Sequence, residues 1–405
     1  MANCIVAQSG GPTAVINSSV IGLLQANKDN KVFNKVYAGL NGIEGILAGN
    51  IIDLSSFSDN EINSFRYTPS SGLGSCRYKM KNIEESTEEY DKLLDILKAN
   101  NIEAFFYIGG NDSMDTISKL GKYANDNNIN IKFIGIPKTI DNDLMYTDHT
   151  PGFGSAAKFI ATTALETYLD SSVYINNGIF ILETMGRDTG WLAASACMAR
   201  INGESIADFI YLPEVAFNIE DFLIDVKKRF EEKNKVFIVV SEGLRNSEGQ
   251  FITEVKSQAH DKFGHAQLGG VGNYLKNLII NSGITNRVKS LELGVLQRCA
   301  IHCASDIDLQ EAFDVGYSAL NFALKENSGC MVAIKRECNE PYKTSHFLIE
   351  ANKIANNVKY FPKELINESG NHVKDEALEY FLPLISGIPS LVIDNHLPKF
   401  KTIEK

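Results

Sequence analysis

Two apolar stretches, each followed by a short polar loop, lie between residues 104 and 143 and constrain the fold more than any other feature of the sequence. The first run, 104–108, is followed by Gly109 and Gly110 and then by apolar residues at helical spacing. The second run, 131–136, is followed by the loop 137–143. This order predicts a β-α-β unit, in which parallel strands bring both loops to one carboxyl edge of a sheet.

Both loops have the composition of a phosphate site. Paired glycines let the backbone approach a ligand closely, and the free N–H groups at the start of the next helix favour an anion. In the second loop, Lys138 would neutralise phosphate charge, and a neighbouring Asp would accept the proton of an attacking hydroxyl. Either loop alone is equally compatible with an ordinary turn. Because the two occur one helix apart, they together indicate phosphoryl transfer, which requires a base, cations and a bridging metal.

The two loops resemble those of the phosphofructokinases, whose ATP-using members carry Gly-Gly-Asp-Gly-Ser and Pro-Gly-Thr-Ile-Asp-Asn-Asp. Pyrophosphate-using members have Asp and Lys in place of two of these glycines, and this chain has Asp112 and Lys138 there. A carboxylate at Asp112 would repel the α-phosphate of a nucleotide, and Lys138 adds charge for a small, dense anion. The resemblance implies that Asp141 is the base, that Lys138 and Thr139 stabilise the moving phosphoryl group, and that Asp143 binds substrate.

Asn111 departs from the family pattern, since most members have a metal-binding Asp at this position. An amide oxygen can coordinate Mg²⁺ but brings no charge, so the cation would depend more on Asp143 or on the phosphates. The resemblance still implies Mg²⁺ as the cofactor, with Asn111 as a metal ligand.

Two further loops resemble the family's donor site. A glycine loop follows the apolar run 3–8, and Gly11 matches the glycine that touches the phosphoryl donor; the loop lacks the P-loop lysine and the dinucleotide spacing. The loop 68–77 is rich in small residues and ends in Arg77, which matches the Arg that reaches the donor phosphates. Without the resemblance, a structural turn and a surface loop are the alternatives.

Five residues of the second half resemble the family's sugar-phosphate site. Three follow the apolar run 178–183, one follows the run 237–241, and the last ends a Leu-Gly-x-x-Gln-Arg motif. An arginine beside a glycine at a strand end, such as Arg187, suits the geometry of phosphate binding. Without the resemblance, Met185 could be a core side chain and Glu242 a solvated carboxylate. The five residues are Met185, Gly186, Arg187, Glu242 and Arg298.

Three other features are given structural interpretations. His149, in a loop with Pro and Gly, is expected to be an exposed histidine rather than a catalytic one. Glu214 is expected to be a loop carboxylate. A helix would bring Cys299, His302 and Cys303 together, but a packed helix is favoured over a zinc site because no fourth ligand is evident.

Composition limits the class of protein. The chain has 405 residues, 44% of them hydrophobic and 22% charged, which predicts two or more domains. A net charge of −11 without a basic block argues against nucleic acid as a partner. Seven scattered cysteines without a CxxC pair fit reduced thiols, and no apolar run reaches the roughly 18 residues of a membrane span. We expect a cytoplasmic protein without membrane partners.

The resemblance covers about residues 3–320 and implies an α/β fold of two doubly wound, Rossmann-like domains, with the active site in the interdomain cleft. Residues 1–150, with about 298–345, would form the phosphoryl-donor domain. Residues 151–297, with 346–405, would form the sugar-phosphate domain. The expected reaction transfers a phosphoryl group from pyrophosphate to O1 of fructose 6-phosphate in a homo-oligomer, dimer or tetramer. The alternatives are an ATP-dependent enzyme of the same fold and a non-catalytic, sugar-phosphate-binding regulatory subunit.

Overall fold

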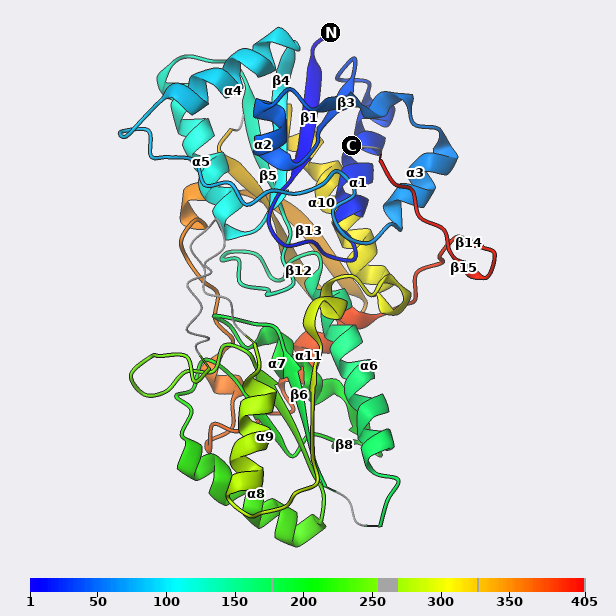
Figure 1. Cartoon of the computed structure of the whole chain (residues 1–405). Coiled ribbons are helices and arrows are strands. Elements are labelled where there is room, and N and C mark those ends of the chain that lie inside the picture. Colours follow the sequence, from blue (N-terminus) through cyan, green and yellow to red (C-terminus); the bar gives the residue numbers. More distant parts are fainter. Residues whose placement is uncertain (176–177, 254–268, 326–327, 404–405) are drawn as a thin grey trace. The chain divides into compact units, whose positions relative to one another are not determined.

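The computed structural model describes residues 1–175, 178–253, 269–325 and 328–403. Within it the chain forms two compact units, each made of segments that are distant in sequence (Figure 1). Unit 1 comprises Met1–Ser155, Arg298–Val358 and Gly387–Lys405, and unit 2 comprises Ala156–Gln297 and Lys359–Ser386.

Unit 1 is built on a seven-stranded sheet with the order β13-β12-β5-β4-β1-β2-β3. The pairs from β12 to β2 are parallel, and the outermost strands β3 and β13 pair antiparallel. The connection from β1 to β2 runs toward one edge and that from β4 to β5 toward the other, so the order reverses between β1 and β4, where open α/β sheets bind ligands. The strands are β1 (Asn3–Gln8), β2 (Val36–Gly39), β3 (Ile51–Asp53), β4 (Ile102–Gly109), β5 (Lys132–Pro137), β12 (Cys330–Asn339) and β13 (Tyr342–Glu350).

The predicted β-α-β unit is confirmed. β4 pairs in parallel with β5, with Ile108 opposite Ile136 and Gly109 opposite Pro137, and α5 (Asn111–Asp126) connects them. Both strands are buried almost throughout, as expected of central parallel strands covered on both faces. The loops that follow Gly109 and Pro137 therefore leave the same edge of the sheet.

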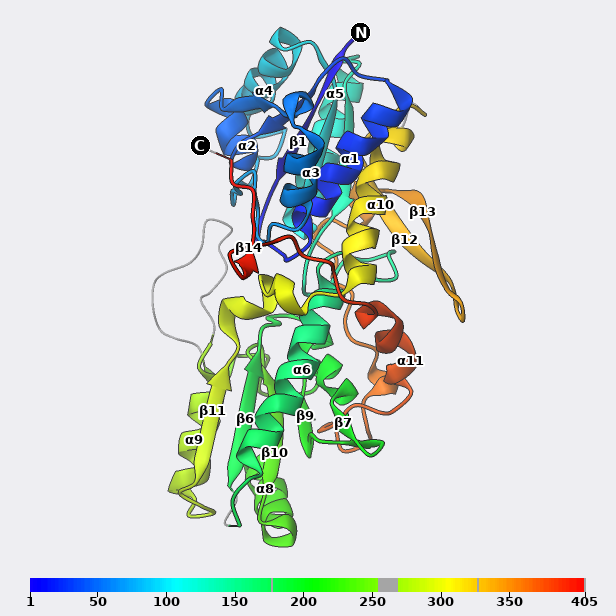
Figure 2. The same cartoon turned by 90° about the vertical axis from the view of Figure 1, so that its right-hand side faces the viewer.

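Helices cover both faces of this sheet (Figures 1 and 2). Alternate residues of β1 point to opposite cores: Cys4 and Val6 belong to one and Ile5 and Ala7 to the other. This three-layer arrangement is the doubly wound fold predicted from the sequence. The first face carries α1 (Ile16–Asn30), α3 (Asp59–Arg66) and α10 (Asp306–Ala323), and the second carries α2 (Gly42–Leu47), α4 (Glu88–Ala99) and α5.

Helices α1 and α10 approach each other closely. A Cβ on Gly22 would lie 1.9 Å from Phe313 O, and a Cβ on Gly316 would lie 2.0 Å from Ser19 O. Only glycine permits backbone contact at these two points. The position of α10 is thereby fixed against the helix that follows the first glycine loop.

Unit 2 is built on a four-stranded parallel sheet with the order β11-β6-β10-β9. The core of one face is completed by α8 (Ile219–Lys233) and α9 (Val271–Asn281). On the other face, Tyr168 of α6 (Phe153–Ser171) contacts Phe237, which stacks on Phe180. The strands are β6 (Ile179–Thr184), β9 (Phe209–Tyr211), β10 (Val236–Ser241) and β11 (Val288–Glu292).

The segment Lys359–Ser386 joins unit 2 through aromatic packing. Trp191, in α7 (Trp191–Ala194), packs edge-on against Phe361 and against Phe381 of α11 (Ala377–Phe381). A short hairpin of β7 (Arg200–Ile201) and β8 (Glu204–Ser205) is attached to this segment by the Arg200–Asp375 ion pair (2.9 Å).

The C-terminal part is divided differently from the expected domains. Residues 346–358 and 387–405 belong to unit 1. β13 completes the sheet of unit 1, and beyond the hairpin of β14 (Ile393–Asp394) and β15 (Leu397–Pro398), Lys401 N donates to Thr68 Oγ1 (3.0 Å). Such contacts join segments that are distant in sequence, which local apolar spacing cannot reveal. The donor and sugar-phosphate roles of the two units stay predictions.

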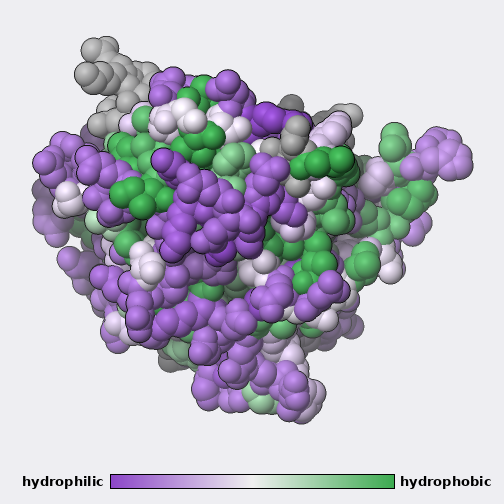
Figure 3. All heavy atoms as spheres, turned by 90° about the horizontal axis from the view of Figure 1, so that it is seen from below, coloured by the Kyte–Doolittle hydropathy of each residue, from purple (hydrophilic) through white to green (hydrophobic). Residues whose placement is uncertain are grey.

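The surface is mixed in character. The face in Figure 3 is covered largely by hydrophilic residues, with hydrophobic residues in scattered groups, which is ordinary for a folded chain. None of the helices in the described ranges combines the length and apolarity that crossing a bilayer requires.

Candidate active site

The loop after β1 is hydrogen-bonded to the loop that carries Arg77. Gly10 has a φ of +74°, a conformation that residues with a side chain rarely adopt. Gly10 N donates to Cys76 O (3.0 Å), and Ser75 Oγ donates to Gly10 O (2.7 Å). Gly11 and Arg77 therefore lie on loops that are bonded to each other.

Two buried amides hold the loop 68–77 in place. Asn17 Nδ2 donates to Thr68 O (2.7 Å), and its Oδ1 accepts from Gly72 N (3.0 Å). Gln8 Nε2 donates to the same Asn17 oxygen (2.8 Å), while Gln8 Oε1 accepts from Leu73 N (3.0 Å). Sequence reasoning missed Gln8 and Asn17, because nothing in the local pattern tells which backbone a buried amide will bind.

Lys138 lies beneath the glycine loop. Its side chain is inserted between backbone carbonyls, with Nζ donating to Ser9 O (2.7 Å) and Gly11 O (2.5 Å), and the residue is only 3% exposed. Its backbone N donates to Gly109 O (3.1 Å). The lysine of the loop after β5 thus contacts the loop after β1.

The charge of Lys138 is strongly influenced by its surroundings. Burial lowers the pKa of Lys138 to about 7; Asp141 and Asp143 act to raise it, and Arg298 and Arg77 to lower it. The charges of these four side chains therefore act on Lys138. Three cations with two carboxylates form a locally positive cluster in a chain of net charge −11, as an anion site requires.

The loop 139–143 has a fixed turn at its centre. Asn142 is fully buried with a φ of +56°, which Asn tolerates better than most residues. Its Oδ1 accepts from Thr150 N (3.1 Å), and Thr150 Oγ1 donates to Thr139 O (2.9 Å). Asp141 N in turn donates to Thr139 Oγ1 (3.0 Å). Asp141 and Asp143 flank this turn in the sequence.

The loop after β4 ends at the first turn of α5. Gly109 is required there, because a Cβ would lie 1.9 Å from Ser113 Oγ. Gly110 precedes the helix, and Asp112 is the acidic residue of its first turn, a favourable place for a carboxylate. The predicted Asp112 therefore lies at the start of α5, directly after the glycine pair.

The amide of Asn111 is engaged with the turn 354–357. Its Nδ2 donates to Ile354 O (3.2 Å) and Asn357 O (2.6 Å), and its Oδ1 accepts from Asn356 N (2.6 Å). An aspartate could not donate either of the first two bonds. In the described part of the chain, no group of three or more His, Cys, Asp or Glu side chains is arranged to hold a metal ion. Metal binding by Asn111 stays a prediction.

Unit 2 gathers the residues predicted after β6 and β10. The two strands end together, with Thr184 opposite Ser241. Gly186 N donates to Glu242 Oε1 (3.3 Å), and Gly186 O accepts from Ser241 Oγ (2.5 Å). Met185, Gly186, Arg187 and Glu242 therefore lie at one sheet edge.

Two carboxyl-edge residues of unit 2 were missed. Gln297 is buried, and its Oε1 accepts from Met185 N (3.1 Å); its place in the motif that ends at Arg298 was the available signal. Burial raises the pKa of Glu183, whose carboxylate accepts from Gly270 N (2.9 Å) and Gly272 N (2.8 Å) at the start of α9.

Arg298 groups with unit 1. Its Nη1 lies 3.4 Å from where a Cβ on Gly11 would stand. The predicted residues thus form two sets, and Arg298, expected among the sugar-phosphate residues, belongs to the set that surrounds Lys138. Unit 1 holds Gly11, Arg77, Asn111, Asp112, Lys138, Thr139, Asp141, Asp143 and Arg298, and unit 2 holds Met185, Gly186, Arg187 and Glu242.

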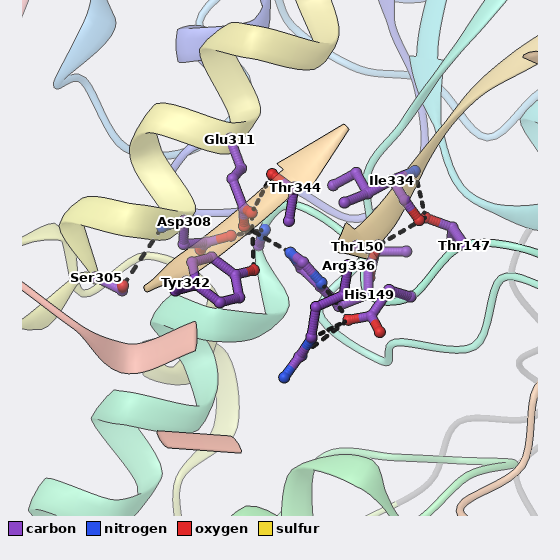
Figure 4. A network of polar contacts seen from close by, with 12 residues as sticks. Thr147, His149, Thr150, Ser305, Asp308, Glu311, Ile334, Arg336, Tyr342 and Thr344 are labelled. Atoms are coloured by element: carbon purple, nitrogen blue, oxygen red, sulfur yellow. Dashed lines mark hydrogen bonds and ion pairs between the residues drawn. The ribbon is translucent and has the colours of Figure 1, made fainter. Parts of the chain in front are cut away.

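The expectation of an exposed His149 is wrong. His149 is 1% exposed, with Nε2 2.6 Å from Glu311 Oε2 and Nδ1 2.8 Å from Asp148 Oδ1 (Figure 4). The loop is rich in turn-forming residues, which suggested exposure, but it contacts α10 and β12, which lie far away in sequence.

Of two other interpretations, the first holds and the second changes. Glu214 lies in the loop between β9 and α8, as expected; its Oε1 accepts from Gly190 N (2.8 Å) and Phe361 N (2.9 Å), and burial raises its pKa. Cys299 and Cys303 do not share one helix, because two short 3₁₀ helices, Gly294–Arg298 and Ile301–Cys303, occupy this stretch.

Glycine loops, a buried lysine and two carboxylates at the switch point of a doubly wound sheet define an α/β protein of the phosphate-binding class. The match to the family described as Phosphofructokinase covers residues 3–323, and the chain belongs to this family. It is 39% identical over 407 residues to a pyrophosphate–fructose 6-phosphate 1-phosphotransferase of Halomonas elongata, covering 100% of this chain and 96% of that protein.

Two solved structures are similar over nearly the whole chain. One is a pyrophosphate-dependent phosphofructokinase from Nitrosospira multiformis, with a TM-score of 0.87, 35% identity, and coverage of 99% of this chain and 96% of that one. The other, from Marinobacter aquaeolei, has a TM-score of 0.87 and 36% identity, with coverage of 100% and 98%. The two-domain phosphofructokinase fold predicted from the sequence is confirmed.

Proposed function

We propose that this protein transfers a phosphoryl group from pyrophosphate to O1 of fructose 6-phosphate, giving fructose 1,6-bisphosphate and phosphate. The observation that carries the proposal is the environment of Lys138. A buried ammonium group, bonded to Ser9 O and Gly11 O, is surrounded by the charges of Asp141, Asp143 and two arginines. These are the groups that phosphoryl transfer needs: cations for phosphate oxygens and a carboxylate for the attacking hydroxyl.

Pyrophosphate is favoured as the donor by Asp112 and Lys138. Both phosphates of pyrophosphate are small and highly charged, so an ammonium placed in the donor site contributes directly to binding. A nucleotide would bring its α-phosphate and ribose toward the first turn of α5, where the Asp112 carboxylate repels the additional phosphate. Gly11, Arg77 and Asp143 complete the proposed donor contacts.

Asp141 acts as the base in the proposed transfer. It takes the proton of the O1 hydroxyl while that oxygen forms a bond to phosphorus and the bridging P–O bond of pyrophosphate breaks. The leaving group is phosphate, so atoms and charge balance without another reactant. Lys138 and the hydroxyl of Thr139 stabilise the moving phosphoryl group, and Asp141 N is fixed by its bond to Thr139 Oγ1 (3.0 Å).

We propose Mg²⁺ as the divalent cation of the reaction. The described protein groups offer few ligands, which suits an ion that is usually held by one or two carboxylates together with substrate phosphates. Asp143 fits such a role. Asn111 fits it less well, because its oxygen already accepts from Asn356 N. When bound, the cation would offset negative charge on the phosphates.

The sugar phosphate is assigned to Met185, Gly186, Arg187, Glu242 and Arg298. The Gly186 N–H bond to Glu242 orients the carboxylate, which would accept hydrogen bonds from sugar hydroxyls. Arg187 and Arg298 would each bind phosphate oxygens through two N–H groups. We further propose that the enzyme is cytoplasmic and forms a homo-oligomer. Light scattering would test the oligomeric state.

The test is to mix the protein with fructose 6-phosphate, pyrophosphate and Mg²⁺ and to follow products by ³¹P NMR. We expect equal amounts of fructose 1,6-bisphosphate and phosphate. Formation of the bisphosphate only when ATP replaces pyrophosphate would overturn the donor assignment. No product with either donor, together with tight binding of fructose 6-phosphate, would favour the regulatory subunit.

A further inference from the structure

The loop between β5 and α6 is closed by contacts between its two ends. Thr139 and Gly152 form an isolated bridge, and Thr150 Oγ1 donates to Thr139 O (2.9 Å). Thr150 N also donates to Asn142 Oδ1 (3.1 Å). The position of Thr150 therefore fixes the residues on both sides of Asp141.

His149, the residue before Thr150, is held at both ring nitrogens by carboxylates. Nε2 lies 2.6 Å from Glu311 Oε2, and Nδ1 lies 2.8 Å from Asp148 Oδ1. Ionised carboxylates only accept, so the ring must donate from both nitrogens and carries a positive charge. Burial opposes that charge, but Glu311 and Asp148 raise the pKa of His149 to about 9.

The two carboxylates are themselves anchored to other elements of unit 1 (Figure 4). Glu311, on α10, accepts from Tyr342 Oη (2.8 Å) and Thr344 Oγ1 (3.1 Å) of β13. Asp148 accepts from Arg336 of β12 through Nη2 (2.8 Å) and Nε (3.0 Å). Two cations and two anions thus form an electrically balanced group, in which His149 and Glu311 are buried and Asp148 and Arg336 are partly exposed. This group ties the loop to three elements.

A neighbouring carboxylate fixes the end of the same loop. Asp308, also on α10, accepts from Gly152 N (2.8 Å) and Ser155 N (2.9 Å). The other titratable groups that influence this network are Asp314 and His346. His346 bonds Ser318 (3.0 Å) on α10. Burial lowers its pKa, with a smaller effect from the charge of His149, but among the described residues no hydrogen bond or ion pair joins His346 to the loop 139–152.

We propose that His149 is a positioning residue for phosphoryl transfer, which through Thr150 holds Thr139 and Asp141 in the geometry that the reaction needs. This inference rests on the proposed function. His149 does not touch the reacting atoms. It fixes the backbone next to Thr150, and Thr150 is hydrogen-bonded to Thr139 and Asn142 on either side of Asp141. A displacement of about 1 Å at reacting groups can cost roughly 100-fold in rate, so loosening this anchor should reduce kcat more than substrate binding.

Three variants test the proposal. In His149→Gln, one end of the amide donates and the other accepts, so one carboxylate loses its donor. We expect kcat to fall about 10- to 100-fold, with KM for both substrates changed less than about threefold. Thr150→Val keeps the shape and the backbone N–H but removes the donor to Thr139 O, and it should lower kcat in the same way. The matched control is His346→Gln, a nearby half-buried histidine, whose kcat should stay within about twofold.

Thr150→Val keeps the test decisive if His149→Gln fails to fold. A normal kcat in folded Thr150→Val, or equal losses in His149→Gln and His346→Gln, would overturn the positioning role. A loss confined to KM would also contradict it.

A spectroscopic measurement separates this inference from the proposed function. In ¹⁵N NMR spectra of the wild-type protein, both ring nitrogens of His149 should carry protons at pH 8, whereas an isolated histidine would be neutral. A neutral ring would overturn the geometry whatever the activity. Inactivity of the wild type with pyrophosphate, with a doubly protonated ring, would instead remove the proposed function.

Discussion

Lys138 should give pyrophosphate use a strong dependence on pH. The protonated ammonium attracts phosphate oxygens, and the neutral amine does not. Because burial lowers the pKa of Lys138 to about 7 in the free protein, the charged form is present below that pH and is lost as pH rises through it. An ordinary lysine, with a pKa near 10.4, would remain charged over the same range.

The size of the effect follows from the pKa. About half of the free protein has a charged Lys138 at pH 7, about a tenth at pH 8 and about a hundredth at pH 9. The value of kcat/KM reports groups in the free enzyme, so kcat/KM for pyrophosphate should fall about tenfold per pH unit above pH 7. A bound anion raises the pKa of Lys138, so kcat should fall less.

Lys138→Arg is the matched control, since a guanidinium stays charged throughout this range. The kcat/KM of Lys138→Arg should be lower than that of the wild type at pH 7, but it should not show the decline above pH 7 that deprotonation of Lys138 causes. Pyrophosphate titrates identically in both assays, so the difference between the two profiles belongs to the lysine. Initial rates from pH 6 to 9 with saturating fructose 6-phosphate provide the measurement. Parallel profiles for the two proteins would refute the argument.

Three further outcomes are expected. Asp141→Ser should lower kcat about 10²- to 10⁴-fold with an unchanged urea midpoint, and near-normal turnover would remove Asp141 as the base. Asn111→Asp should destabilise the protein by about 1–2 kcal/mol in urea unfolding, because two donated bonds to the turn 354–357 are lost; an unchanged midpoint would show that the turn is held otherwise. Because the folded protein raises the pKa of His149 from 6.5 to about 9, protonation of His149 stabilises the fold fully below pH 6.5, and this contribution is lost as pH rises through 9. The contribution to the free energy of unfolding is about 3 kcal/mol, and urea unfolding of His149→Gln should lack this pH dependence.

The sequence predicted the elements that depend on local pattern. Two apolar runs, each followed by a polar loop, predicted β4 and β5 as neighbouring parallel strands, and the strands pair as expected, with Gly109 opposite Pro137. Alternation of helix and strand was sufficient to predict a parallel sheet, because such connections permit few topologies. The parallel arrangement in turn predicted that the loops after both strands lie at the same carboxyl edge of the sheet.

Contacts between distant segments were not predictable from the same pattern. The insertion of Lys138 beneath Ser9 and Gly11 depends on the packing of two loops that no local signal joins. His149 was expected at the surface because Pro and Gly surround it in the sequence. It is buried because its partner Glu311 comes from a segment beyond residue 300, which the local pattern does not reveal. Gln8 looked like any polar residue at a strand end, yet its amide fixes the loop 68–77.

The most direct test of the donor assignment compares kcat/KM for pyrophosphate and for ATP in the wild type and in the double variant Asp112→Gly, Lys138→Gly. The wild type should use pyrophosphate and not ATP, and the double variant should lose pyrophosphate use and gain measurable turnover with ATP. Efficient use of ATP by the wild type would contradict the account of Asp112 and Lys138 and leave only the fold and the family.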